Sequence, residues 1–329
     1  MHAEETRIMH AEETRTMHAE ETRIMHAEET RIMHAEEPRI MSTFELVWDS
    51  RSGVSECPVW DPATRRLYFC DIPGKRINAL SVDDGARTGW DFPEVVGSFG
   101  LCASGRLVVA QRHHVVLFDP RTNSLTPLTP KIDEPATNRL NDGKTGPDGA
   151  FWVGSMDENS PRQPLGALYR VTADGRIEKK SEGYAVSNGL AWSPDGRIMY
   201  HSDSTSAAIE AWDFDAATGE MANHRVIARL TNEDGRPDGA AVDTEGNYWS
   251  AGPSAGCINC FSPTGQLLKK LPFPVPGPTM PCFAEGHMYV TSLREGKSAS
   301  VLAEHPTLGG LFRCPAPAVG APVALFKDA

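Results

Sequence analysis

Four oxygen-bearing side chains recur at matching points of a repeating pattern in the sequence. Three of them precede a turn glycine by eight residues each: Asn141, Asn188 and Asp238. The fourth, Glu56, lies about eleven residues before the apolar strand that begins at Leu67. Two carboxylates and two amides gathered in one buried place would be unfavourable if left empty, but they suit a hard cation that takes oxygen ligands. The pattern therefore predicts a cation site.

A local interpretation of the same residues stays open. Any single Asn or Asp before a turn is also typical of a side chain that hydrogen-bonds the neighbouring backbone. The recurrence at four equivalent positions favours the shared site, provided that the fold brings the four positions together.

Short strands separated by Gly, Pro and Asp turns make up most of the chain, and helical patterns are few. Strands of similar character begin about 40 to 50 residues apart, at Leu67, Leu107, Phe151, Ile198, Tyr248 and Met288. This is the period of a four-stranded propeller blade. We therefore expect an all-β, six-bladed β-propeller whose innermost strands carry the four side chains to one mouth of the central channel.

A ring of sheets also has to close. The strand-like segment 44–48 precedes the first complete blade, and we expect it to pair with the last blade, because this would remove an exposed sheet edge. A β-sandwich or two small β domains would use the same strands, but the repeat favours the propeller.

The first forty residues repeat an octad that begins Met-His-Ala-Glu-Glu. Each copy has too little apolar periodicity to bury a face. We expect residues 1–40 to be a disordered octapeptide tract and residues 41–329 to form one propeller domain.

The formal net charge is −12, of which the octads supply −5 (ten Glu against five Arg), so the rest carries −7 without charged blocks. This balance argues against nucleic acid or an anionic membrane as a partner. No apolar run is long enough to span a bilayer, and no cationic segment followed by an apolar one opens the chain. We expect a cytoplasmic protein, monomeric or weakly dimeric, with a small-molecule partner.

Short motifs surround the four residues: SECPVW at 55–60, RLNDGK at 139–144, SNGL at 187–190 and RPDG at 236–239. Their order and spacing resemble the senescence-marker-protein/gluconolactonase/luciferin-regenerating-enzyme family over essentially all of residues 41–329. The resemblance implies a propeller that hydrolyses a small sugar lactone with one divalent metal ion.

By the same resemblance, Glu56, Asn188 and Asp238 match the metal ligands of the family, and Arg139 and Asn141 match residues that contact the substrate. Three oxygen ligands with added waters discriminate little among Ca²⁺, Mg²⁺, Mn²⁺, Fe²⁺ and Zn²⁺. The sequence therefore predicts one divalent ion without naming it.

The family also carries a glutamate that meets substrate hydroxyls, in the loop after the strand that begins at Phe151. Here the loop reads Asp157-Glu158-Asn159, and Asn159 stands at the matching position. Glu158 and Asn159 are both candidates for substrate contact, and the choice among the three stays open.

Opening a lactone requires a polarised carbonyl, a delivered water and a stabilised oxyanion, all of which a divalent ion can provide. We expect Asp238 to act as general base as well as ligand. The activity would be that of a metal-dependent carboxylic-ester hydrolase. A non-catalytic calcium-binding regulatory propeller and a phosphotriesterase remain alternatives, although the polar Arg139 and Asn141 favour a hydroxylated substrate.

Overall fold

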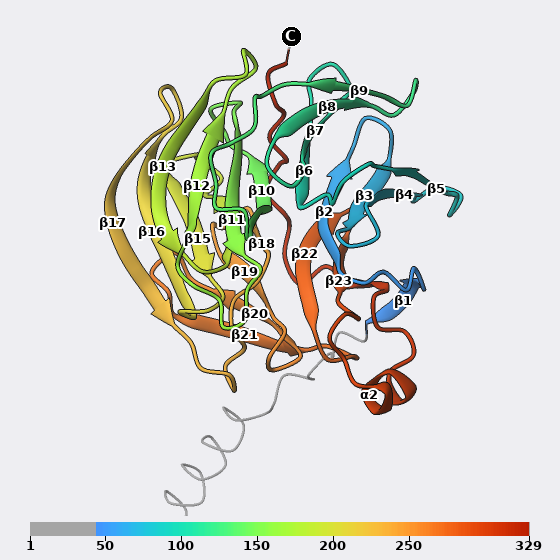
Figure 1. Cartoon of the computed structure of the whole chain (residues 1–329). Coiled ribbons are helices and arrows are strands. Elements are labelled where there is room, and N and C mark those ends of the chain that lie inside the picture. Colours follow the sequence, from blue (N-terminus) through green and yellow to red (C-terminus); the bar gives the residue numbers. More distant parts are fainter. Residues whose placement is uncertain (1–43, 329) are drawn as a thin grey trace, which may run out of the picture. The chain divides into compact units, whose positions relative to one another are not determined.

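The computed structural model describes residues 44–328, and the expected repeat tract of residues 1–40 lies outside this part (Figure 1). Within it, six four-stranded antiparallel sheets follow one another along the chain. The all-β, six-bladed propeller predicted from the repeat is confirmed. The single helix of the described residues, α2 (Ala299–Glu304), lies in the connection between the second and third strands of the sixth blade.

Each blade runs from an inner to an outer strand. The first three blades comprise β2 (Ser55–Asp61), β3 (Arg66–Asp71), β4 (Arg76–Ser81) and β5 (Arg87–Asp91); β6 (Ser98–Leu101), β7 (Leu107–Ala110), β8 (Val115–Asp119) and β9 (Ser124–Pro127); and β10 (Asn138–Thr145), β11 (Phe151–Asp157), β12 (Gly166–Val171) and β13 (Ile177–Tyr184). Blades four and five comprise β14 (Ser187–Trp192), β15 (Ile198–Asp203), β16 (Ala208–Asp215) and β17 (Glu220–Arg229); and β18 (Ala240–Val242), β19 (Tyr248–Gly252), β20 (Cys257–Phe261) and β21 (Leu267–Pro272). The sixth blade comprises β22 (Pro278–Ala284), β23 (His287–Ser292), β24 (Leu311–Pro315) and β1 (Glu45–Trp48).

The inner strands form the ring. β2, β6, β10, β14, β18 and β22 each contact the next in this order, and β22 returns to β2. Figure 1 shows β2, β10, β18 and β22 toward the centre of the sheets. The inner strand β2 is almost wholly buried, whereas the outer strand β9 is exposed along its length. Side chains at the starts of the inner strands therefore converge on one channel mouth.

Apolar side chains fill the junctions between neighbouring blades. Tyr68 of the first blade packs edge-on against Phe99 of the second, with ring centroids 6.5 Å apart. Trp152 of the third blade meets Trp192 of the fourth at 6.1 Å. Each core is thus shared by two sheets, which explains why the second and third strands read as nearly continuous apolar runs.

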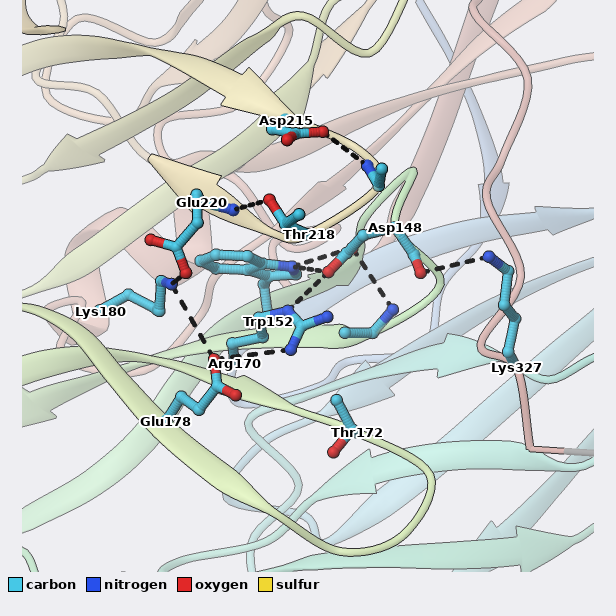
Figure 2. A network of polar contacts seen from close by, with 12 residues as sticks. Asp148, Trp152, Arg170, Thr172, Glu178, Lys180, Asp215, Thr218, Glu220 and Lys327 are labelled. Carbon is cyan, nitrogen blue, oxygen red and sulfur yellow. Dashed lines mark hydrogen bonds and ion pairs between the residues drawn. The ribbon is translucent and has the colours of Figure 1, made fainter. Parts of the chain in front are cut away.

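A polar network spans the third blade and reaches the fourth (Figure 2). The buried carboxylate of Asp148 accepts hydrogen bonds from Arg170 Nε (2.7 Å) and from Trp152 Nε1 (3.1 Å), all within the third blade. Lys180 of this blade pairs with Glu220 of the fourth (2.9 Å). Lys327 Nζ donates to the backbone oxygen of Asp148, so the network also ties the C-terminal segment to the third blade.

The N-terminal strand closes the ring as the sequence predicted. β1 pairs antiparallel with β24, with Glu45 opposite Arg313 and Leu46 opposite Phe312. The ring of Trp48 packs against Phe69 of the first blade at 5.2 Å. β1 therefore covers the edge of β24 and links the sixth blade to the first.

Removing residues 1–48 is expected to lower the free energy of unfolding by at least about 3 kcal/mol, because it exposes the edge of β24 and deletes the packing of Trp48. Removing residues 1–40 is the matched control and should leave the unfolding transition unchanged. Chemical denaturation of both truncated chains would check this. Equal stability of the two chains would show that β1 does not close the ring energetically.

Within residues 44–328, no helix combines the length and the apolar character needed to cross a membrane.

Candidate active site

The structure brings five of the predicted site residues into one cavity of about 580 Å³ at a mouth of the channel. The cavity is lined by Glu56, Arg139, Asn141, Asn188 and Asp238. They come from four different blades, since β2, β10 and β14 carry the first four and Asp238 lies just before β18. The volume lies within the range of small-molecule sites.

Bulges in the inner strands turn these side chains toward the cavity. Pairing between β2 and β3 shifts register between Glu56 and Val59, and pairing between β14 and β15 shifts between Asn188 and Ala191. β10 carries a similar irregularity between Leu140 and Gly143. An extra residue in one strand re-aims its neighbours and is frequent beside active sites. The bulges thus explain how these polar side chains can point into the cavity while the inner strands keep their pairing on either side.

The bulges of β2 and β14 each contain a residue with a left-handed backbone conformation. Gly189, directly after Asn188, has φ of 67°, and a Cβ there would lie 2.2 Å from Tyr248 Oη. Only glycine fits this position. Cys57, directly after Glu56, has φ of 51°, which is strained for a residue with a side chain, and its N–H donates to Glu56 Oε2 at 2.7 Å. This bond fixes the orientation of the Glu56 carboxylate.

A chain of hydrogen bonds orients the amides. Arg139 Nη1 donates to Asn141 Oδ1 (2.7 Å), and Asn141 Nδ2 donates to Asn188 Oδ1 (3.1 Å). Asn188 Nδ2 in turn donates to Ser204 Oγ (2.8 Å), which donates to Pro237 O (2.7 Å). The amide nitrogen of Asn141 is thus bonded to the fourth blade, and that of Asn188 to Ser204 of its own blade. These bonds fix both amides with their oxygens as the remaining acceptors.

The carboxyl groups of Glu56 and Asp238 lie in surroundings that disfavour their ionised form. Burial, followed by the nearby charge of Asp142, raises the pKa of Asp238 to about 8, although part of its surface stays open to the cavity. Burial and then the charges of Asp238 and Asp142 raise the pKa of Glu56 well above its usual value. The two carboxylates therefore disfavour each other's charge, and a bound cation would relieve this cost.

Asp142 is a site residue that the sequence analysis missed. Its side chain is buried, accepts a hydrogen bond from Leu190 N (3.0 Å), and leaves Oδ1 without a partner. Asp142 follows Asn141 directly, so strict strand alternation places it on the other face. The repeat drew attention to Asn141 alone, and only the bulge in β10 explains why both neighbours act on the same site.

The loop after β11 differs from its expected role. Glu158 forms ion pairs with Arg139 (3.3 Å) and Arg112 (2.5 Å) and is absent from the cavity lining, as is the exposed Asn159. Asp157 accepts from the backbone N–H of Asn159 and Gln163. The side chain that this loop contributes to the cavity is that of Arg162.

A serine-hydrolase pattern in the sequence was also overlooked, because residues 252–256 read Gly-Pro-Ser-Ala-Gly. Ser254 lies in the turn between β19 and β20, whereas a nucleophile elbow joins a strand to a helix. Its Oγ accepts from Arg236 N (2.8 Å) and donates to Asn232 O (2.9 Å). No histidine is among the described residues that line the cavity, so the pattern supplies no nucleophile here.

A second cavity of about 210 Å³ has different chemistry. The C-terminal segment contributes Pro322, Val323 and Ala324 to its lining, together with Met280 and Phe283. None of the described residues that line it is an Asp or Glu. It offers no carboxylate to a cation, so the polar cavity is the candidate active site.

The metal-free protein should become less stable as the pH rises. Asp238 binds its proton more tightly in the folded chain (pKa about 8) than in the unfolded chain, so the folded state holds more protons between about pH 4 and pH 8. Its stabilising contribution is complete below the unfolded pKa and is lost as the pH rises through the folded pKa. We expect the melting temperature in chelator to fall between pH 5 and pH 9.

Asp238→Asn is the control for this pH dependence, because the amide keeps the shape and cannot titrate. For Asp238→Asn, the free energy of unfolding should fall less steeply with pH. The difference from the wild type should be up to about 1.4 kcal/mol per pH unit, which corresponds to one proton. Differential scanning calorimetry of both chains in chelator would check this. Identical slopes would show that Asp238 is not the titrating group.

The comparisons with known proteins agree with the motifs. A model of the "SMP-30/Gluconolactonase/LRE-like region" matches residues 54–294. A protein of Pseudomonas putida named 6-deoxy-6-sulfogluconolactonase is 36% identical over 275 residues, which cover 82% of this chain and 94% of that protein. An L-arabinolactonase of Azospirillum brasilense is 35% identical over 271 residues, covering 81% and 90%.

Among solved structures, a luciferin-regenerating enzyme superposes with a TM-score of 0.79 and 28% identity, covering 87% of this chain and 99% of that one. The resemblance predicted from the motifs is therefore confirmed. The chain belongs to the SMP-30/gluconolactonase/LRE-like family.

Proposed function

We propose that this protein hydrolyses a small sugar lactone to the sugar acid, with one divalent metal ion held by Glu56, Asn188 and Asp238. The observation that carries the proposal is the shared cavity, in which these three side chains lie together with Arg139 and Asn141. The 6-deoxy-6-sulfogluconolactonase and the L-arabinolactonase, which are 36% and 35% identical to this chain, support the substrate class.

The residues fit a hard cation. Two buried carboxylates that raise each other's pKa and an oriented amide oxygen form an all-oxygen donor set. Such a set leaves room for water and a substrate oxygen beside three protein ligands. When bound, the ion would polarise the lactone carbonyl and lower the pKa of a water molecule.

The protein side chains would then position the substrate and move the proton. Asp238 would accept the proton of the attacking water at a carboxylate oxygen and pass it to the ring oxygen, which leaves as a hydroxyl group when the carbonyl–oxygen bond breaks. The carboxylic acid that forms would then lose its own proton to solvent. Arg139 is held by its Nη1 bonds to Asn141 Oδ1 and Leu140 O and by the ion pair of Nε with Glu158. This anchoring leaves Nη2 to donate to a substrate oxygen.

The rest of the cavity wall would hold the sugar ring. Val54, Ile72, Met156, Val186 and Leu293 give it apolar surface, against which the carbon face of a ring can pack. Thr205 and Ser254 add hydroxyl groups on the blade-four and blade-five side. This mixture suits a compact hydroxylated substrate.

A proton-release assay tests the proposal. We expect metal-dependent hydrolysis of glucono-, xylono-, arabino- and galactonolactone well above the spontaneous rate, with one or two of them preferred. Paraoxon serves as the phosphotriester control. Calcium binding without turnover of any lactone would favour the regulatory alternative, and turnover of paraoxon alone would favour the phosphotriesterase.

A further inference from the structure

Positive charge gathers on the blade-three side of the active-site cavity. Glu158 pairs with both Arg112 and Arg139, so one carboxylate serves two guanidinium groups. Burial lowers the pKa of Arg139, and the charges of Arg162 and Arg112 lower it further, against the opposing effect of Glu158. Three arginines thus lie near one another, and Glu158 is the acid that pairs with two of them, whereas the carboxylate of Asp157 is engaged with backbone N–H groups of the loop.

Arg162 is the unneutralised member of this group. It is exposed, lines the cavity, and has no hydrogen bond or ion pair among residues 44–328. A free guanidinium at the mouth of a cavity is a ready donor for an oxyanion.

Arg236 adds a second unneutralised charge from the blade-five side. Its Nε donates to Ser204 O (2.7 Å) and its Nη2 donates to Thr205 O (3.1 Å). Backbone carbonyls fix the direction of this guanidinium but cannot cancel its charge. The cavity is therefore bordered by two arginines without a carboxylate partner.

The acidic residue at the rim lies elsewhere. Glu295 lines the cavity after β23 of the sixth blade, which stands opposite the third blade in a ring of six. The lining therefore carries this acid at the sixth blade, Arg162 at the third blade and Arg236 at the fifth. Glu56 and Asp238, the other acids of the lining, are assigned to the metal in the proposed function.

We infer that the rim around Arg162, with Arg236 on the lining of the same cavity, is an anion-binding subsite that selects sugar lactones carrying a sulfonate or phosphate group at the end remote from the lactone carbonyl. This inference rests on the proposed function, because it concerns the far end of the same substrate. The loop after β11 contributes Arg162 to the cavity lining, whereas Glu158 and Asn159 of the same loop lie outside it. A guanidinium without an ion-pair partner binds an oxyanion more strongly than a neutral hydroxyl group.

Steady-state kinetics on three lactones tests the subsite. D-glucono-1,5-lactone is the neutral substrate, and its 6-phospho and 6-deoxy-6-sulfo derivatives are the two anionic ones. The metal-loaded full chain is compared with Arg162→Gln, which removes the charge, and Arg162→Lys, which keeps it. Arg121→Gln is the matched control, since Arg121 is exposed on the second blade and pairs with Asp119 away from the cavity.

We expect the wild type to prefer at least one anionic lactone in kcat/KM. Arg162→Gln should raise KM for that substrate about tenfold with little change in kcat, and the change in KM for the neutral lactone should be much smaller. Arg162→Lys should retain most of the preference, and Arg121→Gln all of it. The better of the two derivatives identifies the anion as phosphate or sulfonate.

Two results would overturn the subsite: no preference for either anionic lactone, or an unchanged preference in Arg162→Gln. Failure of the proposed function would look different, because no lactone would then be hydrolysed. In that case calorimetry with 6-phosphogluconate and 6-deoxy-6-sulfogluconate against gluconate still decides. Tighter binding of an anionic acid that is lost in Arg162→Gln supports the subsite, and equal binding refutes it.

Discussion

Replacing Asp238 by asparagine is expected to lower kcat for lactone hydrolysis at least about a thousandfold, since the change removes a general base and a charged metal ligand together. The substitution keeps the size of the side chain, so the ring of blades should stay intact. Steady-state proton-release kinetics at saturating metal would measure the loss. Asp213→Asn, which changes an exposed carboxylate of β16, is the control and should leave kcat unchanged.

Glu56→Gln separates the two roles of Asp238. Glu56 is proposed as a ligand only, so its loss should weaken metal affinity while kcat recovers at high metal concentration. Asp238→Asn should not recover in this way, because no metal concentration replaces the base. If excess metal restores Asp238→Asn as fully as Glu56→Gln, Asp238 is a ligand and another group accepts the proton.

The propeller could be predicted from the sequence because each blade repeats the same local chemistry. Apolar runs beginning at Phe151, Ile198 and Tyr248 open β11, β15 and β19 at the predicted residues. The same repeat predicted the closing role of residues 44–48. This segment is a strand left over before the first complete blade, and the last blade needs one more strand to cover its edge. Periodicity reports burial, and burial in a propeller is nearly the same in every blade.

The site was predictable only in part. The repeat identified Asn141, Asn188 and Asp238 because they occupy equivalent positions, and the structure places them in one cavity. It missed Asp142, because a bulge in β10 breaks the alternation on which the pattern depends. It also missed Arg162, since the loop after β11 has no period and its conformation is set by the bonds of Asp157 to backbone amides.

Removal of divalent ions is expected to abolish lactone hydrolysis, with a fall in kcat/KM of at least about a hundredfold in chelator. The reason lies in the carboxylates as much as in the lost ion. Without a cation, burial and the charge of Asp142 hold the pKa of Asp238 at about 8, so Asp238 is mostly protonated at pH 7. Burial and the charges of Asp238 and Asp142 raise the pKa of Glu56 as well. A protonated Asp238 cannot accept the proton of water.

Chelation would therefore remove the charge that polarises the carbonyl and, at the same time, leave Asp238 protonated and unable to act as a base. Two consequences distinguish this coupling from the loss of the ion alone. Metal affinity should rise with pH up to about pH 8, because binding displaces a proton from Asp238, and the metal-free chain should release that proton on titration with the ion in unbuffered solution. Full activity of a chain shown by elemental analysis to hold no divalent ion would exclude a metal-dependent mechanism. Metal affinity independent of pH would show that Asp238 is already ionised in the empty cavity, which would leave it free to act as a base without the ion.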